Sequence, residues 1–284
     1  ISREGLGWPN APGIWSDEPV EAWKPVLEHV HEAGGRIFCQ LWHMGRLVHP
    51  DFLGGEAPVS SSVTTAPSFA HTPTGKKPYE EARALTLDDI SRVIDDYGKA
   101  TENAKKAGFD GVEIHSSNGY LFHQFFNQTS NQRTDKYGGS IENRARFFFE
   151  VLDEIKQVIP EQKIGARFNP SLHDMFGMEM DEETIPTFEY IIKKLNDYDL
   201  AYVHLSEPFT DVSELPYAVQ NIAEHFRPMY NGTIIINGGF DQESGNKVLN
   251  EGNADLVAFG KLYVSNPDLV ERIKNDTETQ LIEW

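Results

Sequence analysis

The stretch GVEIHSSNGYLFHQF, residues 111–125, joins a strand-like segment to side chains that can carry chemistry. Apolar Val112 and Ile114 alternate with polar residues, and this period of two is typical of a β-strand. The polar face, formed by Glu113 and His115, leads directly to an amide and a phenol. We interpret the segment as a strand whose carboxyl end carries functional groups.

Five further segments have strand character, and amphipathic helical segments separate them. They are RIFCQLW (36–42), KIGARF (163–168), AYVHLS (201–206), TIIING (233–238) and LVAFG (256–260). Strict alternation of strands and helices predicts an α/β fold with a parallel sheet. Because no G-x-G-x-x-G follows a strand, a Rossmann fold is disfavoured. We predict a TIM (β/α)8 barrel, with six of its eight strands recognisable.

One helix is predicted after Thr86, because Thr86 and Asp89 have the spacing of a capping pair and Gly108 suits the end. Its apolar stripe consists of Leu87, Ile90, Val93, Ile94, Tyr97, Ala100 and Ala104. Further helices are predicted in EAWKPVLEHVHEAGG (21–35), between Ser140 and Pro160, and from near DEET (181–184). In the first of these, Pro25 either kinks the helix or marks its true start.

Residues 44–85 break the alternation, since they are rich in Pro, Gly, Ser and Thr. A loop this long at the carboxyl end of a strand is expected to cover the face where barrel enzymes work. The alternative is a disordered excursion.

The composition limits the function classes. Lys+Arg is 25 against Asp+Glu 44, and a net charge of −19 argues against nucleic acid or an anionic membrane as partner. The single cysteine, Cys39, forbids an internal disulfide and a Cys-ligated metal cluster. No long apolar run or signal peptide is visible, so we expect a cytoplasmic protein. Residues 1–284 are expected to form a single domain.

The residues after strand 111–115 suggest a site that polarises a substrate oxygen. The imidazole of His115 and the amide of Asn118 can each donate a hydrogen bond to one carbonyl or nitro oxygen, which stabilises a developing enolate. The phenol of Tyr120 is a candidate proton donor to carbon. The alternative is a structural histidine at a strand end with a local turn.

Other strands offer groups that suit a flavin ring. Gln40 shares a strand face with Trp42, and an amide can both donate to and accept from the edge of a pyrimidine ring. Arg167 lies near a strand end on the inward side, where a guanidinium needs an anion. That anion is either a reduced flavin or the carboxylate of Glu113.

Glycines follow the last two predicted strands, as in a phosphate site. Gly238 and Gly239 end one strand, and Gly260 with Lys261 ends the next. Backbone N–H groups at such glycines can close around a phosphate, and Lys261 adds a positive charge. Tight turns without a ligand remain the alternative.

Together these segments resemble the Old Yellow Enzyme family of flavin-dependent ene-reductases. The most distinctive block is AGFDGVEIHSSNGYLFHQFFNQTSNQRTDKYGGSIENRARF (107–147). The segments PGIW (12–15), GGRIFCQLWHMGR (34–46) and ADLVAFGKLYVSNPDL (254–269) agree with the family in order and spacing.

The resemblance implies an NAD(P)H-dependent FMN ene-reductase, in which hydride passes from flavin N5 to the β-carbon of an activated alkene. It assigns the activating oxygen of an α,β-unsaturated carbonyl or nitro compound to His115 and Asn118, and protonation to Tyr120. It also implies phenolic ligands and a monomer or homodimer. The cofactor-binding and pocket residues that it implies are Gln40 and Arg167 for the flavin ring, Gly238, Gly239, Gly260 and Lys261 for the phosphate, and Trp42 for the pocket wall.

Three departures from the family pattern qualify this assignment. Lys261 stands where the family usually has arginine, so weaker FMN retention is expected. The chain begins just before the family's third strand, and it ends at LIEW (281–284), before the family's C-terminal tail. We expect this sequence to omit the ends of an intact enzyme. The alternative is a truncated barrel that cannot bind FMN alone and acts as an interaction or complementation partner.

Other enzyme classes fit less well. A Schiff-base aldolase needs a lysine inside a strand, and none is present at an inward position. A metal-dependent hydrolase could draw on ten histidines, but none falls in H-E-x-x-H spacing. We therefore predict no metal site.

Overall fold

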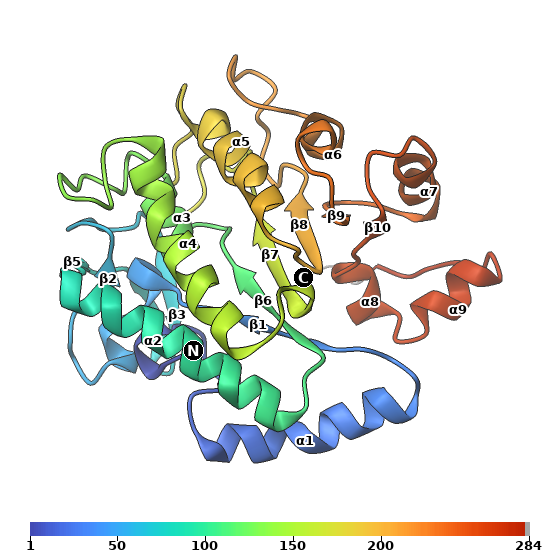
Figure 1. Ribbon diagram of the computed structural model, residues 1–284, viewed down its shortest axis with the longest axis horizontal. Coiled ribbons are helices and arrows are strands. Elements are labelled where there is room, and N and C mark those ends of the chain that lie inside the picture. The colour runs from blue at the N-terminus through green and yellow to red at the C-terminus, as the bar shows by residue number, and fades with distance from the viewer. Residues whose placement is uncertain (282–284) are drawn as a thin grey trace.

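A parallel sheet forms the centre of the computed structural model, which describes residues 1–281 (Figure 1). Its strand order is β1-β6-β7-β8-β9-β10, so the strands of this sheet lie in the order in which they occur along the chain, and crossover connections join these parallel neighbours. The strands are β1 (Phe38–Leu41), β6 (Gly111–His115), β7 (Ile164–Phe168), β8 (Tyr202–Ser206), β9 (Ile234–Asn237) and β10 (Leu256–Val257). All six predicted strands are confirmed. The last three residues of LIEW, and thus the end of the expected domain, lie outside the described residues.

Helices alternate with the strands of the sheet, as predicted. They are α1 (Asp17–Glu32), α2 (Leu87–Ala107), α3 (Leu121–Phe126), α4 (Ile141–Val158), α5 (Thr184–Lys194), α6 (Ile222–Phe226), α7 (Gln242–Asn250), α8 (Lys261–Ser265) and α9 (Leu269–Lys274). Of these, α1 precedes β1, α2 to α7 lie between strands, and α8 and α9 follow β10. Short 3-10 helices are η1 (Arg3–Gly5), η2 (Gly45–Leu47), η3 (Pro50–Phe52), η4 (Glu161–Lys163), η5 (Leu195–Asp197) and η6 (Arg227–Met229). Figure 1 shows α1, α2, α4 and α5 arranged as successive neighbours beside the sheet.

The helix ends follow from local chemistry. Thr86 and Asp89 form a reciprocal capping box at the start of α2, and Gly108 ends it in the left-handed conformation, as predicted. One member of the predicted stripe, Leu87, is exposed instead, because it lies in the first turn, beside the cap. Pro25 lies inside α1, so it does not mark the start of that helix.

The core lies between the sheet and these helices. Apolar strand residues such as Ile114, Ala166 and Val203 are buried together with phenylalanines of α3 and α4. Because strand side chains alternate, the polar residues of the same strands point to the opposite face, which is the inside of the barrel. The apolar face holds the fold and leaves the inner face free for chemistry.

The long segment 44–85 is ordered, so the disordered alternative is wrong. It contains the parallel pair β2 (Val59–Ser60) and β5 (Arg83–Ala84), and the antiparallel hairpin of β3 (Phe69–Thr72) and β4 (Gly75–Pro78). Asp51 anchors the hairpin by accepting hydrogen bonds from Thr74 at 2.8 Å and from Lys77 at 2.6 Å.

Within residues 1–281 no helix has the length and apolar character that crossing a membrane requires. No cluster of three or more His, Cys, Asp or Glu there could hold a metal ion. His29 and His31 bond the carbonyl of Pro25 and the carboxylate of Asp110 instead.

Candidate active site

The parallel register gathers the predicted site residues at one end of the sheet. Gln40 in β1 pairs in register with Glu113 in β6. His115, the last residue of β6, pairs in register with Arg167 in β7. Because these positions share the inward face, their polar groups converge where the strands end.

Three of the predicted residues form an aromatic cluster. The ring centres of His115 and Tyr120 are 5.0 Å apart, those of Trp42 and Tyr120 are 4.9 Å apart, and Trp42 stacks on His115 at 6.0 Å. The rings of His115 and Trp42 lie nearly parallel, whereas that of Tyr120 meets each edge-on. The sequence therefore identified a real spatial cluster.

Further aromatic residues extend the cluster of His115, Tyr120 and Trp42, and the sequence did not predict them. Tyr79 belongs to the same buried group as Tyr120 and Met44, and Trp8 and Phe176 pack against that group. They come from three separate loops, where no strand or helix period marks them. The sequence offered one signal for them: Trp8 lies close to the PGIW segment (12–15).

His115 is held as a neutral imidazole. Burial, reinforced by the nearby charge of Arg167, lowers its pKa to about 3. The hydroxyl of Ser117 lies 3.1 Å from Nδ1. When that hydroxyl donates to Nδ1, the ring proton lies on Nε2, and His115 can donate one hydrogen bond to a ligand.

Asn118 occupies a strained turn directly after β6. Its φ of 57° lies in the left-handed region, and Gly119 follows at 79°. The Nδ2 group of Asn169 donates to Oδ1 of Asn118 at 3.2 Å. The amide of Asn118 is therefore held by its oxygen.

Tyr120 retains its proton at neutral pH. Burial raises its pKa, while a hydrogen bond from the indole of Trp8 and the charge of Arg167 oppose that rise. The residue is the N-cap of α3 and is buried. A protonated phenol in this place can serve as a general acid.

Gln40 belongs to a hydrogen-bonded chain across the inner face of the sheet. Its Nε2 donates to one oxygen of Glu113 at 2.5 Å, and His204 Nδ1 lies 2.9 Å from the other. Asn237 then reaches Nε2 of His204 at 2.6 Å. A carboxylate only accepts hydrogen bonds, so Glu113 turns the amide N–H of Gln40 toward itself and leaves the amide oxygen for a ligand.

The hydrogen-bonded chain through Glu113 bears on the two predicted anions for Arg167. Glu113 is engaged by Gln40 and His204, and its pKa is lowered to about 2, chiefly by the hydrogen bond from His204 acting against burial. Within residues 1–281 Arg167 forms no ion pair, and its buried Nε has no hydrogen-bond partner. Burial lowers the pKa of Arg167. A partly buried guanidinium with an unpartnered Nε favours an anionic ligand beside it, since the charge of Glu113 offsets only part of the effect of burial.

The predicted phosphate residues lie beyond the ends of β9 and β10. Gly238 has φ of 119°, and a Cβ there would meet the Glu207 side chain at 2.8 Å. Gly239 and Gly260 both face open space, with no atom within 4 Å of a Cβ. Lys261 follows directly as the first residue of α8. The backbone at these glycines is accessible to a ligand on the same side of the sheet as Arg167.

These observations fit FMN. The unpaired guanidinium suits the electron-rich edge of the ring, the free amide oxygen of Gln40 suits the ring N3–H, and the open glycines suit the phosphate. Ser206, at the end of β8, and Trp42 also carry buried polar atoms without partners in the described chain, as expected where a polar ligand belongs.

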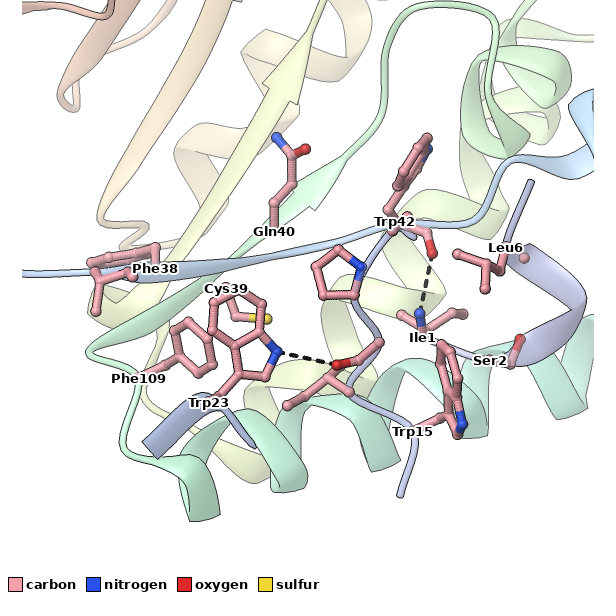
Figure 2. Close-up of a pocket in the computed structure, with 16 residues that line it drawn as sticks. Ile1, Ser2, Leu6, Trp15, Trp23, Phe38, Cys39, Gln40, Trp42 and Phe109 are labelled. Atoms are coloured by element: carbon pink, nitrogen blue, oxygen red, sulfur yellow. Dashed lines mark hydrogen bonds between the residues drawn. The ribbon is translucent and has the colours of Figure 1, made fainter. Parts of the chain in front are cut away.

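An apolar cavity of about 250 Å3 lies beside β1, and Gln40 and Trp42 are among the residues that line it (Figure 2). Figure 2 shows Gln40 on one side of β1 and Cys39, Trp23 and Phe109 on the other. His115, Asn118 and Tyr120 do not line this cavity. The reactive groups therefore converge elsewhere, at the strand ends.

Comparison with known proteins agrees with this geometry. Residues 1–280 match the NADH:flavin oxidoreductase / NADH oxidase family. Putative 12-oxophytodienoate reductase 5 of Oryza sativa subsp. japonica is 42% identical over 279 residues, covering 97% of this chain and 73% of that protein. The 12-oxophytodienoate reductase 1 of the same plant is 40% identical over 278 residues, covering 97% and 72%.

Solved structures give the same result. The old yellow enzyme homologue from Zymomonas mobilis superposes with a TM-score of 0.93 at 40% identity, over 99% of this chain and 78% of that one. Morphinone reductase in complex with tetrahydroNAD superposes with a TM-score of 0.91 at 37% identity, over 99% and 77%. The predicted barrel fold and the predicted resemblance are confirmed.

Proposed function

This chain belongs to the NADH:flavin oxidoreductase / NADH oxidase family and is an NAD(P)H-dependent FMN oxidoreductase; within that class we propose that it reduces activated C=C bonds of α,β-unsaturated carbonyl or nitro compounds. The observation that carries the proposal is the cluster of neutral His115, the Asn118 amide and protonated Tyr120. Two hydrogen-bond donors and one acid are what a conjugated oxygen and its α-carbon require. Relatives named 12-oxophytodienoate reductases support a conjugated ketone as the substrate class.

In the proposed mechanism the side chains of this chain divide the work. His115 and Asn118 bind the activating oxygen and stabilise the negative charge that develops on it. FMN, when bound, supplies the hydride that the β-carbon accepts. Tyr120 delivers its phenolic proton to the α-carbon, and the aromatic wall of Trp42 and Trp8 keeps water away.

The residues that would hold FMN are those predicted from the sequence. Gln40 would accept from the ring, and Arg167 would favour negative charge on it. The backbone of Gly238, Gly239 and Gly260 would surround the phosphate, with Lys261 as its counter-charge. We also propose that residues 1–284 form one flavin-binding domain, active as a monomer or homodimer, with phenols as ligands.

The alternative, a truncated barrel that acts only as an interaction partner, receives no support from these comparisons. The absorption spectrum of the purified protein tests it. The proposed enzyme has the visible bands of FMN and loses them when NADPH or NADH is added under nitrogen. A colourless protein that takes up no FMN would favour the interaction partner.

The test of the mechanism is Tyr120→Phe. Without the phenol, reoxidation of the reduced enzyme by an enone is expected to slow by roughly 10²-fold or more, because general acid catalysis is lost. Reduction by NADPH is expected to remain within a few-fold of wild type, since it needs no proton from Tyr120. Rapid mixing measures the two half-reactions separately.

Tyr97→Phe is the matched control, because the Tyr97 hydroxyl is fully buried in α2 among the core residues. It should leave both half-reactions unchanged. Equal slowing of both half-reactions by Tyr120→Phe would contradict the proposed role of the phenol.

A further inference from the structure

We propose that Asn169 is a positioning residue that orients the amide of Asn118, so that Asn118 presents its N–H bonds rather than its oxygen to the substrate. This inference rests on the proposed function, in which Asn118 binds the activating oxygen. Asn169 itself touches neither the substrate nor the flavin in this proposal. It acts through Asn118.

The fold brings the two amides together from neighbouring strands. Asn169 is the first residue after β7, and Asn118 lies in the turn after β6. These strands are adjacent and parallel, so the segments leaving their carboxyl ends lie side by side. Asn169 is fully buried, and its Nδ2 donates to Oδ1 of Asn118 at 3.2 Å.

The chemistry of an amide gives this contact its meaning. An amide is planar, with an acceptor at one corner and two donors at the other. Rotation by 180° would exchange them and would place the oxygen of Asn118 against the substrate oxygen, where two acceptors repel. A donor held at the Oδ1 side therefore favours the orientation that can bind an oxyanion.

The second amide atom of Asn169 supports a dedicated role. Its Oδ1 is buried and has no hydrogen-bond partner within the described chain. A side chain kept only for packing would avoid that unpaired polar atom. The Asn169 side chain donates to Asn118 through Nδ2, while its Oδ1 has no partner in the described chain.

The neighbouring donor is fixed in a comparable way. Ser117 lies beside Nδ1 of His115, whereas Asn169 lies beside Oδ1 of Asn118. Each substrate-facing donor thus has one polar neighbour on its far side. The pair of donors is oriented before a ligand arrives, which lowers the cost of reorganisation in the transition state.

Three holoenzyme variants test the inference, with 2-cyclohexenone as a neutral substrate. Asn169→Asp replaces the donor by a group that, once ionised, only accepts, so the amide of Asn118 must turn its N–H bonds toward position 169. Asn169→Leu removes the donor and leaves the amide free to rotate. Asn118→Leu removes the amide itself.

At pH 8 we expect Asn169→Asp to slow reoxidation by 2-cyclohexenone by about tenfold or more, and Asn169→Leu by roughly two- to tenfold. The Asn169→Asp defect should shrink toward pH 5, where the new carboxyl regains a proton and can donate again. The Asn169→Leu defect should not follow that profile. In the Asn118→Leu background neither change at 169 should slow reoxidation further.

Different outcomes separate this inference from the proposed function. Equal defects in Asn169→Asp and Asn169→Leu, or defects that persist in the Asn118→Leu background, would overturn the role of Asn169. If Asn169→Asp does not fold, the comparison of Asn169→Leu with and without Asn118→Leu gives the same decision. A wild-type enzyme that binds FMN but does not reduce the enone would instead overturn the proposed function.

Discussion

Glu113 shows how one buried acceptor sets the direction of a neighbouring amide. Because it receives the N–H of Gln40 and is backed by His204, the oxygen of Gln40 is the atom left for a ligand. This arrangement stabilises the charged form of the carboxylate, and the pKa of Glu113 is lowered to about 2. The carboxylate therefore remains ionised throughout the pH range in which the enzyme would work.

Glu113→Gln should weaken FMN binding. A neutral amide can donate as well as accept, so the amide of Gln40 loses its fixed direction. We expect the dissociation constant of FMN to rise roughly three- to tenfold, measured by quenching of flavin fluorescence on addition to the apoprotein. Glu189→Gln is the control, because Glu189 lies in α5 and bonds Lys193 and His225. An unchanged constant would exclude this orienting role.

Lys261 is the residue that departs from the family pattern. An ammonium meets a phosphate as a point charge, whereas a guanidinium can form two parallel hydrogen bonds. Lys261→Arg is therefore expected to tighten FMN binding by several-fold, measured in the same titration. Lys247→Arg, on the exposed face of α7, should have no effect. Unchanged binding by the arginine variant would show that position 261 does not contact the phosphate.

At the scale of elements, side chains of α3 form hydrogen bonds with both the N–H and the carbonyl of Gly119 in the turn between β6 and α3. The N–H of Gly119 donates to Nδ1 of His123 at 3.3 Å, and its carbonyl accepts from Nε2 of Gln124 at 2.8 Å. Gln124 also holds the carbonyl of Met44 at 3.0 Å. The first turn of α3 thus fixes the backbone between Asn118 and Tyr120.

Gly119→Ala should disturb this turn and the chemistry together. A left-handed φ of 79° costs about 1–3 kcal/mol for a residue with a Cβ, and that Cβ would lie 3.3 Å from Met178. We expect a comparable loss of stability and about tenfold slower enone reoxidation. Gly139→Ala is the matched control: its φ is 77°, but its Cβ would meet nothing within 4 Å. If Gly119→Ala and Gly139→Ala are reoxidised by the enone equally slowly, the loss of rate is not specific to the turn between β6 and α3.

The arrangement of strands, helices and loops explains which features the sequence could predict. Strands and major helices were predictable because burial imposes a period of two or 3.6 on their residues. The location of His115, Gln40 and Arg167 followed from that period and the parallel register. Trp8, Tyr79 and Phe176 could not be found in this way, because loops impose no period. The Asn118–Asn169 bond depends on how two turns meet, which no local pattern records.

At the scale of the whole molecule, one sheet separates two environments. Its outer face is apolar and packs against the helices. A polar chain with members from four strands runs across its inner face, from Gln40 through Glu113 and His204 to Asn237. Burial of polar and titratable groups is the cost of building the site inside the barrel. That cost should appear in the pH dependence of stability.

His115 and His123 make this dependence measurable. Burial lowers the pKa of each to about 3, against an ordinary value of 6.5. Between these values the folded protein keeps both rings neutral, whereas the unfolded chain protonates them. The unfolded state therefore binds more protons, and stability must fall as the pH drops from about 6.5 toward 3.

His123→Asn isolates one of the two groups. Asparagine places Oδ1 where Nδ1 accepts from Gly119, so the turn is kept while the titrating ring is lost. Unfolding in urea at pH 5 should take up about one proton fewer than in wild type, and stability should fall less steeply by about 1.4 kcal/mol per pH unit. An indicator dye in weakly buffered solution counts the protons directly. Proton uptake in His123→Asn equal to that of wild type would mean that this ring is already protonated in the folded enzyme.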